Sequence, residues 1–187
     1  MPTLHVCPLG RLDETVTATA ASHVVTLINL GTAVARPASI RADRHLFVHL
    51  SDIVEPLDGH ILPTAEHVVD LLRFAGRWER EKPLVFHCFA GISRSTATAY
   101  ITACALAPER SEAEIAAALR HSSPTATPNA LMVALADDHL GRGGRMADAV
   151  RAIGRGQEAF AGKPFTLALL RSGGASGRAC KAATQRS

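Results

Sequence analysis

Cys88 and Arg94 are separated by five residues, and the residues around them are typical of a reactive site. Residues 84–88 are a short apolar run that ends in the cysteine, and a turn of small residues containing Gly91 follows. Helical character begins at Arg94. This order predicts a strand, a tight loop and the N-terminus of a helix.

The loop of residues 89–94, here called the phosphate loop, predicts an anion site. The backbone N–H groups of a tight loop and of the first turn of a helix lack internal partners, so they converge on an anion. The same dipoles and the Arg94 guanidinium favour the thiolate form of Cys88, which makes it a candidate nucleophile at the floor of the site. Arg94 is a permanently charged fork that can hold two phosphate oxygens.

The run from His87 to Ser95 resembles the signature of the cysteine-dependent protein tyrosine phosphatase superfamily, and is most similar to its compact dual-specificity branch. The resemblance covers roughly residues 23–140. It implies a phosphocysteine mechanism that uses no metal or other cofactor. The roles it implies are nucleophile for Cys88, sulfur hydrogen bonding for Ser95, loop ordering for His87, and phosphate binding for Phe89, Ala90, Gly91, Ile92, Ser93 and Arg94.

The resemblance also implies a general acid on a loop that precedes the cysteine and follows a strand. A carboxylic acid there protonates the leaving group. We favour Asp52, because it comes directly after an apolar run, and Asp58 is the alternative. Either aspartate could instead end a strand or form a turn, and Asp58-Gly59 is a good turn dipeptide. Asn129, in a Pro-Asn pair that opens a late helix, is a candidate for holding the active-site loops or for a simple helix cap.

Other interpretations of the cysteine stay open at this point. It could be an inert, buried hydrophobic residue. A rhodanese-type sulfurtransferase also carries a cysteine in a loop before a helix, although its loop is usually shorter. A non-catalytic phospho-binding module is the main alternative to an enzyme. As substrate we expect a phosphorylated protein or a small aryl phosphate; the phosphate loop has no lysine, which argues against a highly anionic lipid headgroup.

Strands are expected near residues 3–9, 23–30, 45–50 and 84–87, and helices lie between and after them. This alternation predicts an α/β fold with a mostly parallel central sheet of four to five strands flanked by helices. Ligands bind such sheets at the carboxyl ends of the strands, where Cys88 lies. Later helices are expected over 93–106, 111–120 and 130–140, followed by a glycine hinge at 141–144.

The 187 residues are 47% hydrophobic and 20% charged, as in one globular domain with a good core. We expect a single phosphatase-like domain over residues 1–170 and a disordered basic tail over 171–187, which has little to bury. The four cysteines lack metal-ligand spacing and the nine histidines are scattered, so no metal site is predicted.

The chain shows no leader pattern and no long apolar run, so we expect a cytoplasmic protein without a membrane partner. The net charge is +3, but aromatic residues make up only 4% and no dense basic run occurs. These features argue against nucleic-acid binding. The oligomeric state is left open.

Overall fold

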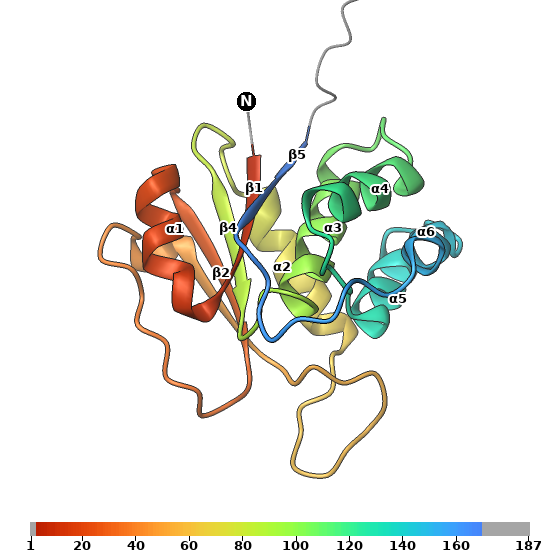
Figure 1. Ribbon diagram of the computed structural model, residues 1–187, viewed down its shortest axis with the longest axis horizontal. Coiled ribbons are helices and arrows are strands. Elements are labelled where there is room, and N and C mark those ends of the chain that lie inside the picture. Colours follow the sequence, from red (N-terminus) through yellow and green to blue (C-terminus); the bar gives the residue numbers. More distant parts are fainter. Residues whose placement is uncertain (1–2, 170–187) are drawn as a thin grey trace, which may run out of the picture.

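The computed structural model describes residues 3–169, and five strands in them form one sheet (Figure 1). The strand order is β3-β2-β4-β1-β5. Four strands are parallel: β1 (Thr3–Pro8), β2 (His23–Ile28), β3 (His45–His49) and β4 (Leu84–Cys88). β5 (Phe165–Ala168) pairs antiparallel with β1. The predicted α/β fold with a mostly parallel sheet is confirmed.

Helices cover both faces of the sheet, unequally (Figure 1). Helix α1 (Leu12–Thr19) packs on one face, where Cys7, Val24 and Val85 form a small core with it. The neighbouring strand residues point to the other face, because side chains alternate along a strand. The larger core lies there, under α2 (Ala65–Gly76), α3 (Arg94–Leu106), α4 (Glu112–Ser122), α5 (Ala130–His139) and α6 (Arg145–Ile153).

Helix α3 is buried along almost its whole length, which fixes its first residue relative to the sheet. It packs against β4 and β1 on one side and against α4 and α5 on the other. The hydroxyl of Tyr100 donates to the carbonyls of Glu112 and Met146, each at 3.3 Å. Arg94 therefore starts from a rigid position beside the carboxyl end of β4.

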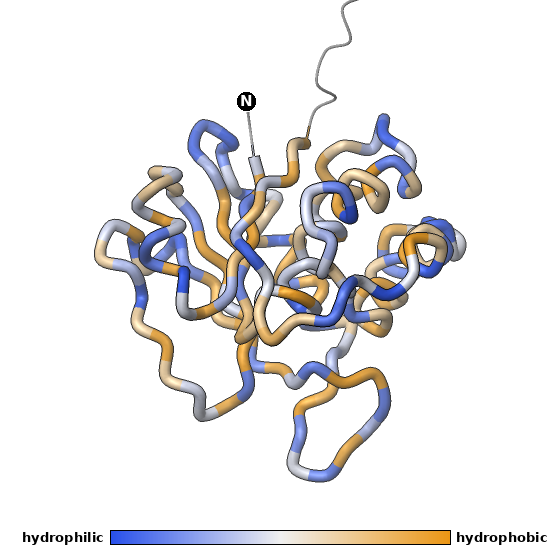
Figure 2. Tube along the Cα trace, viewed as in Figure 1, coloured by the Kyte–Doolittle hydropathy of each residue, from blue (hydrophilic) through white to orange (hydrophobic). Residues whose placement is uncertain are grey.

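Two features differ from a regular alternation of strands and helices. The crossover from β2 to β3 has no α-helix: residues 29–41 are a loop, followed by the short 3-10 helix η2 (Ala42–Arg44). Strand β5 was not expected from the sequence. Long loops also leave the carboxyl edge of the sheet, and the loop after β3 carries both hydrophobic and hydrophilic stretches (Figure 2).

Among residues 3–169, no helix is long and apolar enough to cross a membrane. The same residues contain no group of three or more histidine, cysteine or acidic side chains placed to hold a metal ion. The tail predicted over residues 171–187, with Cys180, lies outside the described part of the chain.

Candidate active site

Cys88 is the last residue of β4, and α3 begins at Arg94, so the phosphate loop spans the short gap between the sheet and the helix. The Cys88 side chain is buried. Its Sγ lies 3.2 Å from Ser95 Oγ and accepts a hydrogen bond from the Gly91 N–H at 3.3 Å. The sulfur therefore lies beside a hydroxyl and a backbone N–H at the start of the phosphate loop.

Three carbonyls of the phosphate loop are held from outside. Leu9 N–H donates to Phe89 O at 3.1 Å, Gly162 N–H to Ala90 O at 2.8 Å, and Thr127 N–H to Ile92 O at 2.9 Å. The N–H and C=O of a planar trans peptide point in opposite directions. With these carbonyls fixed outward, the N–H groups of Ala90, Gly91 and Ser93 are turned toward the interior of the loop.

The turn of the loop requires glycine at position 91. Gly91 has a φ of +69°, a conformation that side chains with a Cβ rarely adopt. A Cβ there would lie 2.7 Å from Pro8 N and 2.8 Å from the carbonyl carbon of Cys7. The end of β1 therefore packs directly against the phosphate loop, and only a residue without a side chain fits between them.

Arg94 is 5% exposed and is fixed by two acceptors. Its Nη1 donates to Asn29 Oδ1 at 2.6 Å and to Leu50 O at 2.8 Å. Its Nε is buried and has no hydrogen-bond partner among the described residues. An unpaired buried donor is costly, so a bound oxyanion would complete this site. The guanidinium lines a cavity of about 450 Å³ together with Asn29, Asp52 and Phe89.

Asp52 is brought to the start of α3 from the loop after β3. Its Oδ1 accepts from Ser93 Oγ at 2.7 Å and from Asn129 Nδ2 at 2.9 Å. Asn129 also caps α5, because its Oδ1 accepts from Met132 N–H at 3.0 Å. Asp58 is exposed, and within residues 3–169 its side chain makes no hydrogen bond or ion pair with the protein.

His87 lies beneath the phosphate loop in a buried polar chain. Its Nε2 is 2.6 Å from Thr26 Oγ1, which is 2.7 Å from His45 Nε2. Burial lowers the pKa of His87 and of His45 to about 4 in each case. His87 is therefore neutral near pH 7 and is placed to support the strand end below Cys88.

Sequence reasoning missed Asn29, Thr26, the Leu50 carbonyl and the amides of Leu9 and Gly162. Asn29 directly follows β2, so its place at the carboxyl edge of the sheet was the one available signal. Backbone groups give no such signal, because every residue type carries them.

Solved structures that resemble this chain are phosphatases. One is the PTP-2 phosphatase of Cydia pomonella, with 20% identity, a TM-score of 0.57, and coverage of 72% of this chain and 84% of that one. Another is DUSP15, with 15% identity, a TM-score of 0.60, and coverage of 81% and 92%. A third is the Yvh1 phosphatase domain from Chaetomium thermophilum, with 18% identity, a TM-score of 0.55, and coverage of 76% and 93%.

The fold is that of the protein tyrosine and dual-specificity phosphatases. No protein-family model matches the sequence, and no curated protein matches it. At these low identities the likeness speaks for the fold, and the chemistry must be argued from the residues at the site.

Proposed function

We propose that this protein hydrolyses phosphate monoesters through a phosphocysteine intermediate on Cys88. The observation that carries the proposal is the buried Arg94, whose Nε has no partner among the described residues, at the end of a loop with inward N–H groups and a buried thiol at its start. Such a site is built for a multiply charged oxyanion next to a nucleophile.

In the first step the Cys88 thiolate attacks phosphorus, a sulfur–phosphorus bond forms, and the ester oxygen leaves. Asp52 gives its proton to that oxygen. Arg94 and the loop N–H groups hold the other phosphoryl oxygens as charge redistributes during transfer. The step needs Cys88 without its proton and Asp52 with its proton.

In the second step water attacks the phosphorus and gives a proton to the Asp52 carboxylate. The sulfur–phosphorus bond breaks, and inorganic phosphate and the thiolate are released. Ser95 Oγ, 3.2 Å from the sulfur, stabilises the departing thiolate by donating its hydroxyl proton in a hydrogen bond. Protons balance over the two steps, because Asp52 ends in the state in which it began.

Phosphorylated protein side chains and small aryl phosphates are the substrates we expect. The phosphate loop carries one permanent charge, that of Arg94, and no lysine, which suits a single phosphate monoester. The nucleophile must stay reduced, which fits a reducing compartment such as the cytoplasm.

The test is phosphate release from an aryl phosphate by the wild-type protein and by Cys88→Ser, with EDTA and a reductant, from pH 5 to 8. We expect metal-independent turnover that disappears in Cys88→Ser while phosphate affinity is kept. Cys104→Ala is the matched control: burial raises the pKa of this α3 thiol to about 12, so it stays an unreactive thiol, and activity should persist.

Two outcomes would overturn the proposal. A folded, reduced wild-type protein that binds phosphate without turnover would be a phospho-binding module. Thiosulfate-dependent sulfur transfer without phosphate release would make it a sulfurtransferase.

A further inference from the structure

A segment outside the region of family resemblance runs along the phosphate loop. Residues 154–164, here called the strap, connect α6 to β5 and pass beside the end of the sheet where Cys88 lies (Figure 1). The strap contributes to a cavity of about 610 Å³ whose other lining residues are Ile92, Ser93 and Thr127. It is therefore a neighbour of the phosphate loop over several residues.

Both ends of the strap are anchored. At its start, the Arg120 guanidinium of α4 donates to Ile153 O at 2.8 Å, to Gly154 O at 2.9 Å and to Ala126 O at 2.7 Å. The Arg120 guanidinium therefore connects the strap to the loop before α5. In that loop, the Thr127 N–H donates to Ile92 O of the phosphate loop. At its end, β5 pairs with β1.

Gly162 makes the contact with the phosphate loop. Its N–H donates to Ala90 O at 2.8 Å. The same peptide unit carries the Gly91 N–H, which donates to Cys88 Sγ at 3.3 Å. One peptide plane thus links the strap to the sulfur: with its carbonyl fixed by Gly162, its N–H is fixed toward Cys88.

The fit at Gly162 is tight, and a side chain there would press on its neighbours. A Cβ there would lie 3.0 Å from Gly91 O and 3.4 Å from Thr125 Oγ1. At Gly156 a Cβ would lie 2.6 Å from the Thr125 carbonyl group. The strap approaches the active-site loops at both places through backbone alone.

We propose that the strap is a positioning element of the active site. Gly162 orients the Ala90–Gly91 peptide so that its N–H stabilises the Cys88 thiolate. Arg120 holds the start of the strap in place through its hydrogen bonds to backbone carbonyls. The effect on turnover rests on the proposed function, whereas the effect on the reactivity of the Cys88 sulfur does not. The two can therefore be tested separately.

The experiment measures the rate of Cys88 alkylation by iodoacetamide against pH in the full chain, read by mass spectrometry on the peptide that contains Cys88. For Gly162→Ala we expect the midpoint of the alkylation profile to rise by about half a pH unit, because one hydrogen bond to the thiolate is weakened. The turnover number for an aryl phosphate should fall about threefold to tenfold. A merely structural role would leave the alkylation profile unchanged.

Arg120→Lys is the second variant, because it touches neither Cys88 nor the phosphate loop. Lysine keeps the charge but lacks the forked guanidinium, so we expect the midpoint of the alkylation profile to rise by less than in Gly162→Ala. Gly76→Ala, at the end of α2 with no atom within 4 Å of a new Cβ, is the control and should behave as wild type. Thermal melting identifies any variant that has lost its fold.

Unchanged alkylation profiles in folded Gly162→Ala and Arg120→Lys would overturn the strap proposal, whatever the wild-type turnover. A shifted profile in a protein without phosphatase activity would support the strap and remove the proposed function. A shifted profile together with reduced turnover would support both.

Discussion

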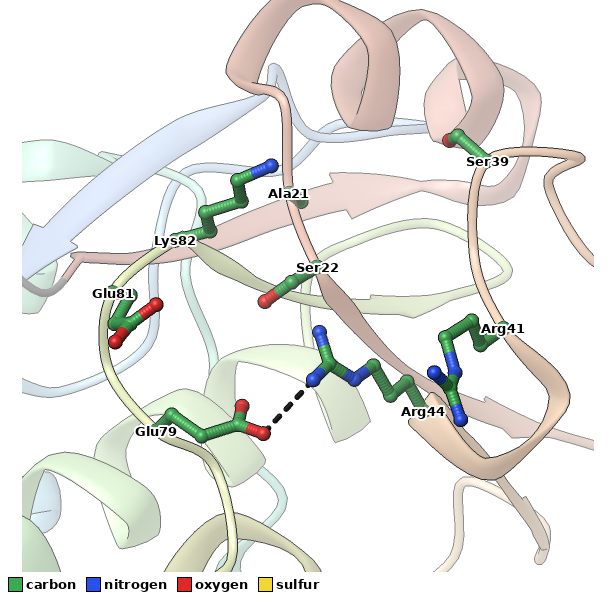
Figure 3. A pocket seen from close by; sticks show the side chains of 8 residues that line it. All are labelled: Ala21, Ser22, Ser39, Arg41, Arg44, Glu79, Glu81 and Lys82. Atoms are coloured by element: carbon green, nitrogen blue, oxygen red, sulfur yellow. Dashed lines mark hydrogen bonds and ion pairs between the residues drawn. The ribbon is translucent and has the colours of Figure 1, made fainter.

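The two ends of the sheet each carry a cavity lined by arginine and a carboxylate, yet they differ in how the charges are held. At the amino end, a cavity of about 430 Å³ is lined by Arg41, Arg44, Glu79 and Lys82, with Ala21, Ser22, Ser39 and Glu81 (Figure 3). Arg44 pairs with Glu79 at 2.9 Å, and Arg41 pairs with Asp43 at 3.0 Å. These cations already have carboxylate partners in contact with solvent.

At the carboxyl end the single guanidinium of Arg94 is buried and keeps an unpaired Nε, as judged within residues 3–169. Its fixed partners are an amide oxygen and a carbonyl, which leave its charge uncompensated. Exposed ion pairs contribute little and are screened by solvent. On this comparison we expect an anion site where burial, an unused donor and inward backbone N–H groups occur together, and not where cations are most numerous.

Arg94→Lys should have the largest effect among the variants that compare the two ends. Lysine lacks the fork that grips two oxygens while contacting Asn29 and Leu50, so we expect aryl phosphate hydrolysis to fall by about a thousandfold. Arg44→Lys, in the amino-end cavity, should stay within about twofold of wild type. Steady-state kinetics and phosphate binding by calorimetry would measure both. Equal losses in the two variants would contradict the comparison.

Asp52→Asn should have the next largest effect. Loss of the proton donor should reduce the turnover number by about a hundredfold and flatten the alkaline side of the pH–rate profile. Asp58→Asn, on the same loop without a protein partner in the described chain, is the matched control and should keep both the rate and the slope. If Asp58→Asn instead removes the slope while Asp52→Asn keeps it, the two assignments must be exchanged.

The parts of the site that could be predicted from the sequence are the local ones. Cys88, Gly91, Arg94 and Ser95 lie within eight consecutive residues, so spacing alone places them on a strand end, a loop and a helix start. Asn29 reaches Arg94 from 65 residues away and Asn129 reaches Asp52 from 77 residues away. Only the family resemblance indicated the second contact, and the one signal for the first was the position of Asn29 directly after β2.

Strand β5 and the strap show a further limit of sequence patterns. β5 has four residues, and its hydrogen bonds come from β1 at the other end of the chain. The Gly162 contact uses a backbone N–H, which leaves no mark in the residue types around it. Both depend on tertiary pairing, which a local pattern does not contain.

Gly91→Ala tests the part of the comparison that concerns the backbone of the phosphate loop. The variant must adopt a positive φ and also collide with backbone atoms of Cys7 and Pro8, so we expect a loss of hydrolysis of more than tenfold and a clear drop in melting temperature. Gly143→Ala, with a φ of +60° and open space around a new Cβ, isolates the conformational cost. That control should melt about 2–4 °C lower with normal kinetics. If the two variants have the same melting temperature and the same rate of hydrolysis, the close packing of Gly91 against Cys7 and Pro8 has no effect on the site.

The histidines give the smallest expected effect, and they compare one ring beside a carboxylate with two rings buried in the sheet. At the amino end, His23 Nε2 lies 3.7 Å from Glu79, which partly offsets the lowering of its pKa by burial. Inside the sheet, burial lowers the pKa of His87 and of His45 to about 4, and the Thr26 hydroxyl lies between the two rings. Between pH 6.5 and 4 the unfolded chain therefore binds protons that the folded chain does not.

Stability from the neutral histidine pair is thus fully present above about pH 6.5 and is lost as the pH falls toward 4. Melting temperatures measured from pH 7.5 to 4.5 should fall by several degrees, and His45→Gln should flatten part of that fall because one of the two groups no longer titrates. His121→Gln, at an exposed position of α4, should keep the wild-type slope. If His23→Gln flattens the curve more than His45→Gln does, the main pH sensitivity lies at His23, which has a carboxylate nearby, and not at the buried histidine pair.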